Sequence, residues 1–435
     1  MSRICLRAPG ERRRPATADL IVHLNEPGIP GLPLHHDLHR LFPVPGEVGE
    51  VIQAALLTAL AVWAADKILP RRAAGDAWTR EITLEVPAPP RWAATGPLLE
   101  KLLAFLTGDR WSLKFREGEI SRGAAGRWPH SWQPEAVVLF SGGLDSLAGA
   151  IDLLAAGKRL LLVSHYDYGQ LAAVQQTLAK GLQEHFGADR LHHLALRLQC
   201  PRSPELTLRS RSFLYLTLGR AAAAAFGPEV PLLVPENGWI SLNPPLTLNR
   251  LGPYSTRTTH PRFLAGLGEI WAAAGIPCSL DNPYAWLSKG EILARSRAPE
   301  LLARWARLSV SCARPVASRW RGVGGGACGY CYPCLLRRAA LNRVDGDHPG
   351  DYLLDALRAP GLVAERTRGA DLRALLAALH TWQTRPGDIM ARVLPPPGDP
   401  PLGQDPAPAG GRFRGDGRPP GGQGGPLAEG VSPGI

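Results

Sequence analysis

The stretch AVVLFSGGLDSLAGAIDLLAAG, residues 136–157, decides the fold. Its first five residues form an apolar run typical of a buried strand, and the helical stretch that follows ends at Gly157. The same alternation continues with RLLLVSH as a strand, a helix over 171–186, LHHLALRL as a strand, a helix over 210–226 and VPLLV as a strand. Apolar strands separated by amphipathic helices predict an α/β fold with a doubly wound parallel sheet.

The remaining chain differs in composition from this central part. Proline clusters, an apolar stretch over 51–65 and a strand–loop–helix pattern over 80–111 precede it. A Pro- and Gly-rich composition of the kind found in disordered segments follows it. We therefore predict an N-terminal accessory domain (1–130), the sheet domain (131–345), a helical segment (346–393) and a disordered tail (394–435).

The overall composition is that of an ordinary globular protein, with 45% hydrophobic and 20% charged residues among 435. The net charge of +11 fits phosphate-bearing substrates or nucleic acid, but Arg-rich composition alone gives the same charge, so a nucleic-acid partner stays open. The basic N-terminus lacks the apolar region of a secretory signal, and residues 51–65 are too few to span a bilayer. We expect a cytoplasmic protein without a membrane anchor.

A phosphate-binding loop follows the first strand of the sheet domain. Two glycines allow a tight turn that brings backbone N–H groups to phosphate oxygens, and the next helix presents its positive end. No Walker-type lysine is present, so we expect the loop to hold the pyrophosphate of ATP while the α-phosphate is attacked, giving AMP. Asp145 would act through Mg²⁺ or orient the loop. An ordinary capped turn is the alternative. The loop consists of Ser141, Gly142, Gly143, Leu144, Asp145 and Ser146.

Four cysteines are grouped as C-x15-C-x2-C-x2-C. Four thiolates fit tetrahedral Zn²⁺ with no open position, which predicts a structural zinc knuckle. An iron–sulfur cluster and a chance grouping of reduced thiols are the alternatives. The proposed ligands are Cys312, Cys328, Cys331 and Cys334.

With these motifs the chain resembles the PP-loop ATPases, and three segments resemble the QueC family of 7-cyano-7-deazaguanine synthases. They are HYDYGQ (165–170), RSRSFLYLTLGRAAAAAF (209–226, with Ser210 where the family has Asn) and WLSKGEI (286–292). The resemblance, from Glu135 to Asn342, implies ATP-dependent activation of a 7-deazaguanine carboxylate and its transfer to nitrogen. It also implies nucleotide-binding roles for Gly169 and Gln170, and it favours zinc at the cysteines.

A polar segment, PENGWISLNPPLTLNRLGPYSTRTTHPRFL (235–264), is placed to recognise the substrate. Its Asn, Ser and Thr residues could equally satisfy only their own backbone. The STRTTHP stretch and the N-terminal extension resemble QatC, the QueC-like protein of the Qat anti-phage systems, which implies a protein partner from a defence operon. The candidate substrate-binding residues are Glu236, Asn237, Ser241, Arg257, Thr258, Thr259 and His260.

Lys289 is the second candidate catalytic residue beside Asp145, because an ammonium group near the phosphates could neutralise developing charge. Two other function classes stay open: an inactive nucleotide-binding scaffold of a defence complex, and a PP-loop enzyme that acts on tRNA. Trp63, Trp78 and Trp92 could form an exposed docking surface for a partner, or they could pack a small core.

Overall fold

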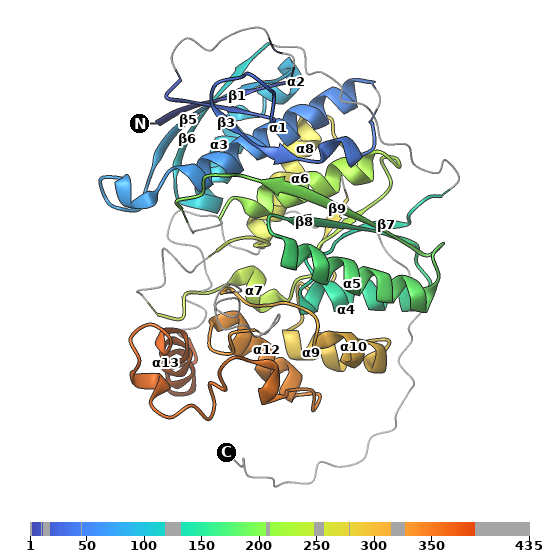
Figure 1. Cartoon of the computed structure of the whole chain (residues 1–435), viewed down its shortest axis with the longest axis vertical. Coiled ribbons are helices and arrows are strands. Elements are labelled where there is room, and N and C mark those ends of the chain that lie inside the picture. The colour runs from blue at the N-terminus through green and yellow to red at the C-terminus, as the bar shows by residue number, and fades with distance from the viewer. Residues whose placement is uncertain are drawn as a thin grey trace. The chain divides into compact units, whose positions relative to one another are not determined.

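The strand–helix alternation predicted after residue 135 is present in the computed structural model (Figure 1). The structure describes residues 2–9, 11, 18–44, 46–117, 132–205, 209–247, 256–277, 279–314 and 327–387. The predicted tail, 394–435, and the predicted boundary near residue 130 lie outside these residues. The elements after residue 135 are β7 (Ala136–Leu139), α4 (Leu144–Ala155), β8 (Leu160–Tyr166), α5 (Gly169–Phe186), β9 (Leu191–Gln199), α6 (Arg211–Ala224), β10 (Leu232–Leu233) and β11 (Leu280–Asp281).

These strands form one six-stranded sheet in the order β11-β10-β7-β8-β9-β4. The pairs from β11 to β9 are parallel, whereas β4 (His35–His36) joins the edge antiparallel to β9. The chain progresses in one direction from β7 to β9 and in the other from β10 to β11. The direction of winding therefore reverses between β7 and β10, and in open α/β sheets ligands bind outside the carboxyl ends of the strands at such a point.

Each face of this sheet has its own core, because neighbouring residues in a strand point to opposite faces. Val138 and Leu162 pack with α4 and α5, whereas Val137 and Val163 pack with α6. Figure 1 shows α4 and α5 on one side of β7–β9 and α6 on the other. The prediction of an α/β fold with a parallel sheet is confirmed.

The N-terminal region forms a second parallel sheet, in the order β3-β2-β1-β5-β6. Its long helix α1 (Gly46–Ile68) and its strands share one continuous apolar core with α6 and the nearer face of the other sheet. Both sheets belong to one unit, Met1–Val393. The other elements of the region are β1 (Ser2–Arg7), β2 (Leu20–His23), β3 (Leu32–Pro33), β5 (Glu81–Pro87), α2 (Pro90–Ala93), α3 (Gly96–Thr107) and β6 (Arg110–Arg116).

Buried polar contacts at the end of α1 join the two sheets. The Asp66 carboxylate, 1% exposed, pairs with Arg80 at 2.6 Å and accepts from the Ser210 N–H at 2.9 Å and the Ser210 hydroxyl at 2.7 Å. The next residue, Lys67, pairs with Asp167 just after β8 at 3.0 Å. The end of α1 thus holds the N-terminal region to the end of β8 and to the start of α6.

Helix α1 is longer than predicted. It has 23 residues, and among the described residues it is the one helix long and apolar enough to cross a membrane, although 83% of its most apolar window is buried inside the structure. Trp63 and Trp92 are 1% and 0% exposed, so of the two alternatives for these residues the packed core is correct. Trp78 is half-buried against Arg71 and Arg209.

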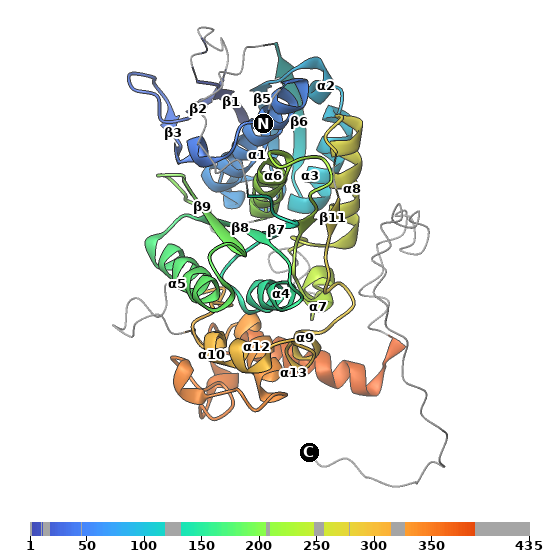
Figure 2. The same cartoon turned by 90° about the vertical axis from the view of Figure 1, so that its right-hand side faces the viewer.

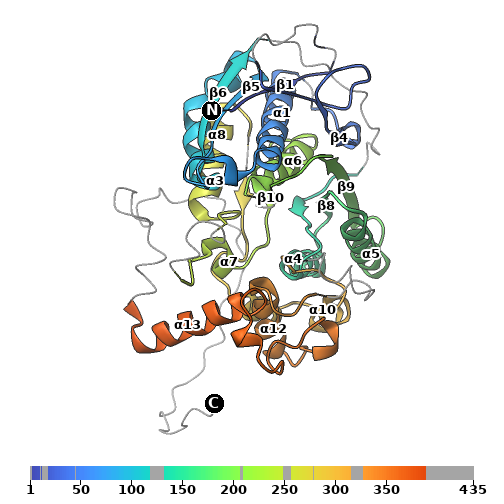
Figure 3. The same ribbon diagram turned by 60° about the vertical axis from the view of Figure 1, so that its left-hand side comes forward.

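Helices α9, α10 and α12 lie below α4 on the side away from the six-stranded sheet, whereas α8 packs on α3 of the N-terminal region (Figure 2). Helix α9 contacts both α4 and α12, and α13 extends from the side of α12 (Figure 3). Helix α9 thus connects α12, which carries Cys334, to α4, which packs on the six-stranded sheet. The remaining helices are α7 (Gly238–Leu242), α8 (Pro261–Ala273), α9 (Lys289–Ala294), α10 (Pro299–Ala306), α12 (Tyr332–Asn342) and α13 (Ala370–Thr384).

Candidate nucleotide site and four-cysteine centre

The predicted phosphate loop connects β7 to the first turn of α4. Gly142 has φ of +80°, in the left-handed region that favours glycine, and a Cβ there would lie 3.2 Å from Gln175. The Ser141 hydroxyl accepts from the Gly143 N–H at 3.2 Å and lies 3.1 Å from the Ser146 hydroxyl. The loop is therefore closed on itself by its two serines, and α4 begins within it.

Asp145 lies at the centre of a cluster that the sequence could not assemble. Its carboxylate forms an ion pair with Lys289 at the start of α9 and accepts from the Asn237 side-chain amide at 2.6 Å. The same amide donates to Glu236 at 3.0 Å. Two candidate catalytic residues and two candidate substrate residues thus meet at the carboxyl ends of β7 and β10.

The structure corrects the expected environment of the loop. Asp145 and Ser146 are each 4% exposed and lie in the first turn of α4, so they are not on a solvent-facing loop. Lys289 is 11% exposed and points to Asp145 rather than to solvent. The Lys289 ammonium group thus places a positive charge directly beside the Asp145 carboxylate.

The two carboxyl groups of the cluster have opposite proton affinities. Burial favours the neutral form of Asp145, but Lys289 and Asn237 outweigh burial and lower its pKa to about 2. Burial and the neighbouring Asp145 charge raise the pKa of Glu236 well above its ordinary value. The pair therefore joins a carboxyl group with a lowered pKa to one with a raised pKa, an arrangement that often marks acid–base sites.

A close approach of the Pro235 ring to Gly149 positions Glu236. A Cβ on Gly149 of α4 would lie 2.5 Å from Pro235, so glycine lets the segment after β10 lie directly on the helix. Asn282, which follows β11, accepts from the Glu236 N–H at 3.2 Å and donates to its carbonyl at 2.8 Å. Sequence reasoning missed Asn282, although an Asn at the carboxyl end of a strand was the available signal.

The other candidate substrate residues divide into two groups. Ser241 and Thr259 share a 3.0 Å hydrogen bond, and Asn282 donates to Ser241 at 3.3 Å, which connects them to Glu236. Arg257 instead donates to the Phe105 carbonyl of α3 at 2.7 Å, and His260 packs against the Phe105 ring. This second group therefore faces the N-terminal region.

His260 holds its position as an uncharged ring. Its Nδ1 accepts from the Arg262 N–H at 3.2 Å and caps α8, while burial and the charges of Arg257 and Arg262 lower its pKa to about 4. It can hydrogen-bond to a ligand but brings no positive charge. Thr258 is half-buried beside it. Ser255, the first residue of the STRTTHP stretch, lies outside the described residues.

Gly169 and Gln170 begin α5 and are both exposed, with open space around the Gly169 Cα. A third residue of the same helix, Gln175, is fully buried and donates to the Ser141 carbonyl at 3.1 Å. Sequence reasoning missed Gln175, which holds the phosphate loop from below. A glutamine inside an amphipathic helix gives no signal of that task.

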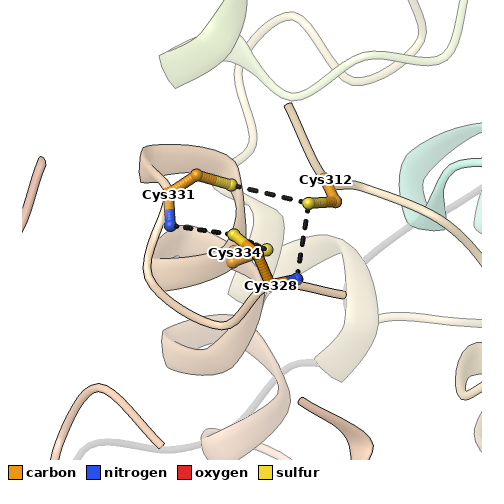
Figure 4. Close-up of side chains that lie close together, drawn as sticks. All are labelled: Cys312, Cys328, Cys331 and Cys334. Carbon is orange, nitrogen blue, oxygen red and sulfur yellow. Dashed lines mark hydrogen bonds between the residues drawn. The ribbon is translucent and has the colours of Figure 1, made fainter. Parts of the chain in front are cut away.

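The four cysteines converge as predicted (Figure 4). Their sulfur atoms all lie within 4.8 Å of one another, with 3.9 Å between Cys312 and Cys331 and 3.8 Å between Cys328 and Cys334. A Zn–S bond of about 2.3 Å gives sulfur–sulfur edges of about 3.8 Å in a tetrahedron. The donor set and spacing therefore fit one Zn²⁺ ion.

Backbone N–H groups support this centre. The Cys328 N–H donates to the Cys312 sulfur at 3.4 Å, and the Cys331 N–H donates to the Cys328 sulfur at 3.3 Å. Such bonds stabilise thiolates and orient them as metal ligands. With four protein ligands the ion would have no open position, so its task would be structural.

Comparison with known proteins supports the site. The chain is similar to 7-cyano-7-deazaguanine synthases over half its length. It is 28% identical to that of Synechococcus sp. (strain CC9605) over 240 residues, which are 49% of this chain and 94% of the relative. It is 28% identical to the Novosphingobium aromaticivorans enzyme (48% and 91% of the two chains) and 23% identical to that of Thermoplasma acidophilum (50% and 92%). No protein-family profile matches the chain.

Proposed function

We propose that this protein is an ATP-dependent, AMP-forming enzyme that activates the carboxylate of a 7-deazaguanine and transfers the acyl group to nitrogen. The observation that carries the proposal is the phosphate loop at the point where the winding of the sheet reverses, with Asp145, Lys289 and Asn237 assembled beside it. The similarity to 7-cyano-7-deazaguanine synthases names the substrate class.

The loop would bind the pyrophosphate part of ATP through Ser141, Gly142, Gly143, Leu144 and Ser146. Their N–H and hydroxyl groups precede α4, a twelve-residue helix whose positive end favours anions. Gly169 and Gln170, exposed at the start of α5, would contact the rest of the nucleotide. Mg²⁺, when bound, would neutralise phosphate oxygens that the protein leaves free.

The reaction would proceed in two transfers. A carboxylate oxygen of the substrate attacks the α-phosphorus, and the bond to pyrophosphate breaks; then an amine attacks the acyl carbon, and AMP leaves. Lys289, held by Asp145, would stabilise negative charge that develops on the phosphates. Glu236 and Asn237, with Ser241 and Thr259 behind them, would bind the polar edge of the ring.

We assign the sheet to the doubly wound PP-loop type, the four-cysteine centre to zinc, and the protein to the cytoplasm. The N-terminal sheet and the contacts of Arg257 and His260 with Phe105 favour a QatC-type member with a protein partner from a defence operon, since half of the chain lies outside the match to the synthases.

The direct test is product analysis by mass spectrometry after incubation with ATP, 7-carboxy-7-deazaguanine and ammonia. We expect AMP together with the amide or nitrile of the deazaguanine. Lys289→Met should abolish both, while Lys158→Met, which changes an exposed lysine paired with Glu135, should leave both unchanged. ATP binding without substrate-dependent AMP would contradict the proposal and favour a nucleotide-binding scaffold.

A further inference from the structure

One short segment, residues 309–312, contacts the phosphate loop along its backbone. The Val310 N–H donates to the Gly142 carbonyl at 2.8 Å, and the Ser311 hydroxyl accepts from the Leu144 N–H at 3.3 Å. A Cβ on Gly143 would lie 3.5 Å from the Val310 carbonyl oxygen. The segment therefore holds both sides of the turn that the proposed function assigns to phosphate.

The same segment is anchored on the side of the cysteines. Its last residue, Cys312, belongs to the four-cysteine centre, whereas the other three ligands come from the 328–334 stretch. Arg337, which lies three residues after Cys334 on α12 and is 3% exposed, donates to the Ser309 hydroxyl at 2.7 Å and to the Ala306 carbonyl at 2.5 Å. Helix α12 thus fixes both ends of the 309–312 segment.

A metal ion would be the strongest of these links. Among the described contacts, Cys312 meets the other cysteines through a sulfur–sulfur contact of 3.9 Å and an N–H contact of 3.4 Å, and four thiolates without a cation repel one another. Bonds to one ion would join Cys312 to α12 directly. The ion would then limit the positions open to Val310 and Ser311, and through them to Gly142 and Leu144.

We propose that the four-cysteine centre orders the phosphate loop through residues 309–312, and that metal binding and nucleotide binding are coupled for this reason. Ser311 and Arg337 act as positioning residues in this coupling. The ordering of the loop follows from the contacts alone, whereas the coupling to nucleotide rests on the proposed function. Thermodynamic reciprocity requires that zinc strengthen nucleotide binding by the same factor by which nucleotide strengthens zinc binding.

Hydrogen–deuterium exchange of the full chain tests the ordering without any nucleotide. We expect Ser311→Ala to keep its zinc and to speed exchange in a peptide over 140–147 by about fivefold, the factor for loss of one ordinary hydrogen bond. Chelation of zinc should speed it at least as much, while a peptide over α6 stays protected. Ser203→Ala, at an exposed serine, is the matched control.

Loss of protection in α6 on chelation would mean general unfolding. Exchange in the zinc-loaded variants would then decide whether residues 309–312 order the phosphate loop. Ser311→Ala and Arg337→Lys should both loosen the 140–147 peptide with zinc still bound. Unchanged exchange of that peptide in both variants would overturn the proposal.

Titration with ATP tests the coupling. In the zinc-loaded protein, Ser311→Ala should weaken ATP binding. In the wild type, zinc removal should weaken ATP binding by the same factor by which ATP removal weakens zinc binding. Equal ATP affinity with and without zinc would overturn the coupling. Failure of the zinc-loaded wild type to bind ATP would refute the proposed function, and the exchange result would still decide the ordering.

Discussion

The side-chain amide of Asn237 donates a 2.6 Å hydrogen bond to Asp145, which lies 92 residues earlier in the chain. Asn237 also caps α7 by accepting from the Ile240 N–H at 3.0 Å. One residue therefore fixes the start of the substrate segment against the first turn of α4. This contact connects the nucleotide side of the site to the substrate side.

The Asp145–Lys289 ion pair should contribute to stability as well as to turnover. Asp145→Ala leaves the Lys289 ammonium group buried without its partner, and removal of one member of a buried pair costs about 3–5 kcal/mol of unfolding free energy. Urea denaturation measures this cost. Asp145→Asn, which keeps the shape and the contact with Asn237, should lose turnover at a smaller cost. Loss below about 1 kcal/mol for the alanine variant would show that the pair is not formed.

Glu236 predicts a pH dependence of stability. Its pKa is raised in the folded protein, so the stability it contributes is fully present below its unfolded pKa, about 4.3, and is lost as pH rises toward the folded pKa. Asp145, with its pKa lowered to about 2, changes stability only at more acidic pH. Between pH 5 and 8 the wild type should therefore lose stability relative to Glu236→Gln.

Urea unfolding at several pH values gives this difference. Glu184→Gln, at an exposed glutamate, should run parallel to the wild type over the same range. A constant difference between wild type and Glu236→Gln from pH 5 to 8 would refute the raised pKa.

Metal analysis of the purified protein should give one zinc per chain. Cys331→Ser replaces one thiolate by a hydroxyl that binds zinc poorly, and it should lose the metal together with the packing around Tyr330 and Leu335. Cys5→Ser, at a buried cysteine of β1 in the N-terminal sheet, should keep one zinc. Iron in place of zinc, or full metal retention in Cys331→Ser, would contradict the tetrahedral zinc assignment.

The N-terminal region should be required for folding of the six-stranded sheet. Deletion of residues 1–130 would expose the face of α6 that packs on α1 and would leave Ser210 without Asp66. We therefore expect insoluble or unfolded protein, rather than a truncated enzyme that retains adenylation. Asp66→Ala should cost about 1–3 kcal/mol in urea unfolding, because Ser210 loses its buried acceptor while Arg80 keeps its ion pair with Asp109. A folded, active truncation would show that the two sheets are independent.

Local patterns explain what the sequence could predict. The β7–α4 turn with Gly142 and the spacing of Cys328, Cys331 and Cys334 depend on residues near one another in the chain, so their geometry follows from the sequence. The contacts of Asp66 with Ser210 and of Ser311 with Leu144 join residues 144 and 167 positions apart. Pairings of that kind depend on how sheets and helices pack, which periodicity does not specify.

Similar limits explain the errors about exposure. Asp145 belongs to a phosphate-loop motif whose residues face a ligand, which predicts exposure, yet its side chain is buried in an ion pair with Lys289. Trp63 was ambiguous because a helix that is apolar on all sides gives no preferred face, and α1 packs between the N-terminal sheet and α6. Burial on both sides could be recognised only once the second sheet was known.

The central claim, attack at the α-phosphate of ATP, is tested most directly by the phosphate products. Incubation of the zinc-loaded protein with ATP, 7-carboxy-7-deazaguanine and ammonia should release pyrophosphate and AMP in equal amounts. Without ammonia, labelled pyrophosphate should exchange into ATP only when the carboxylate is present. Asp145→Asn and Lys289→Met should abolish this exchange. Release of ADP and inorganic phosphate by the wild type would contradict the account.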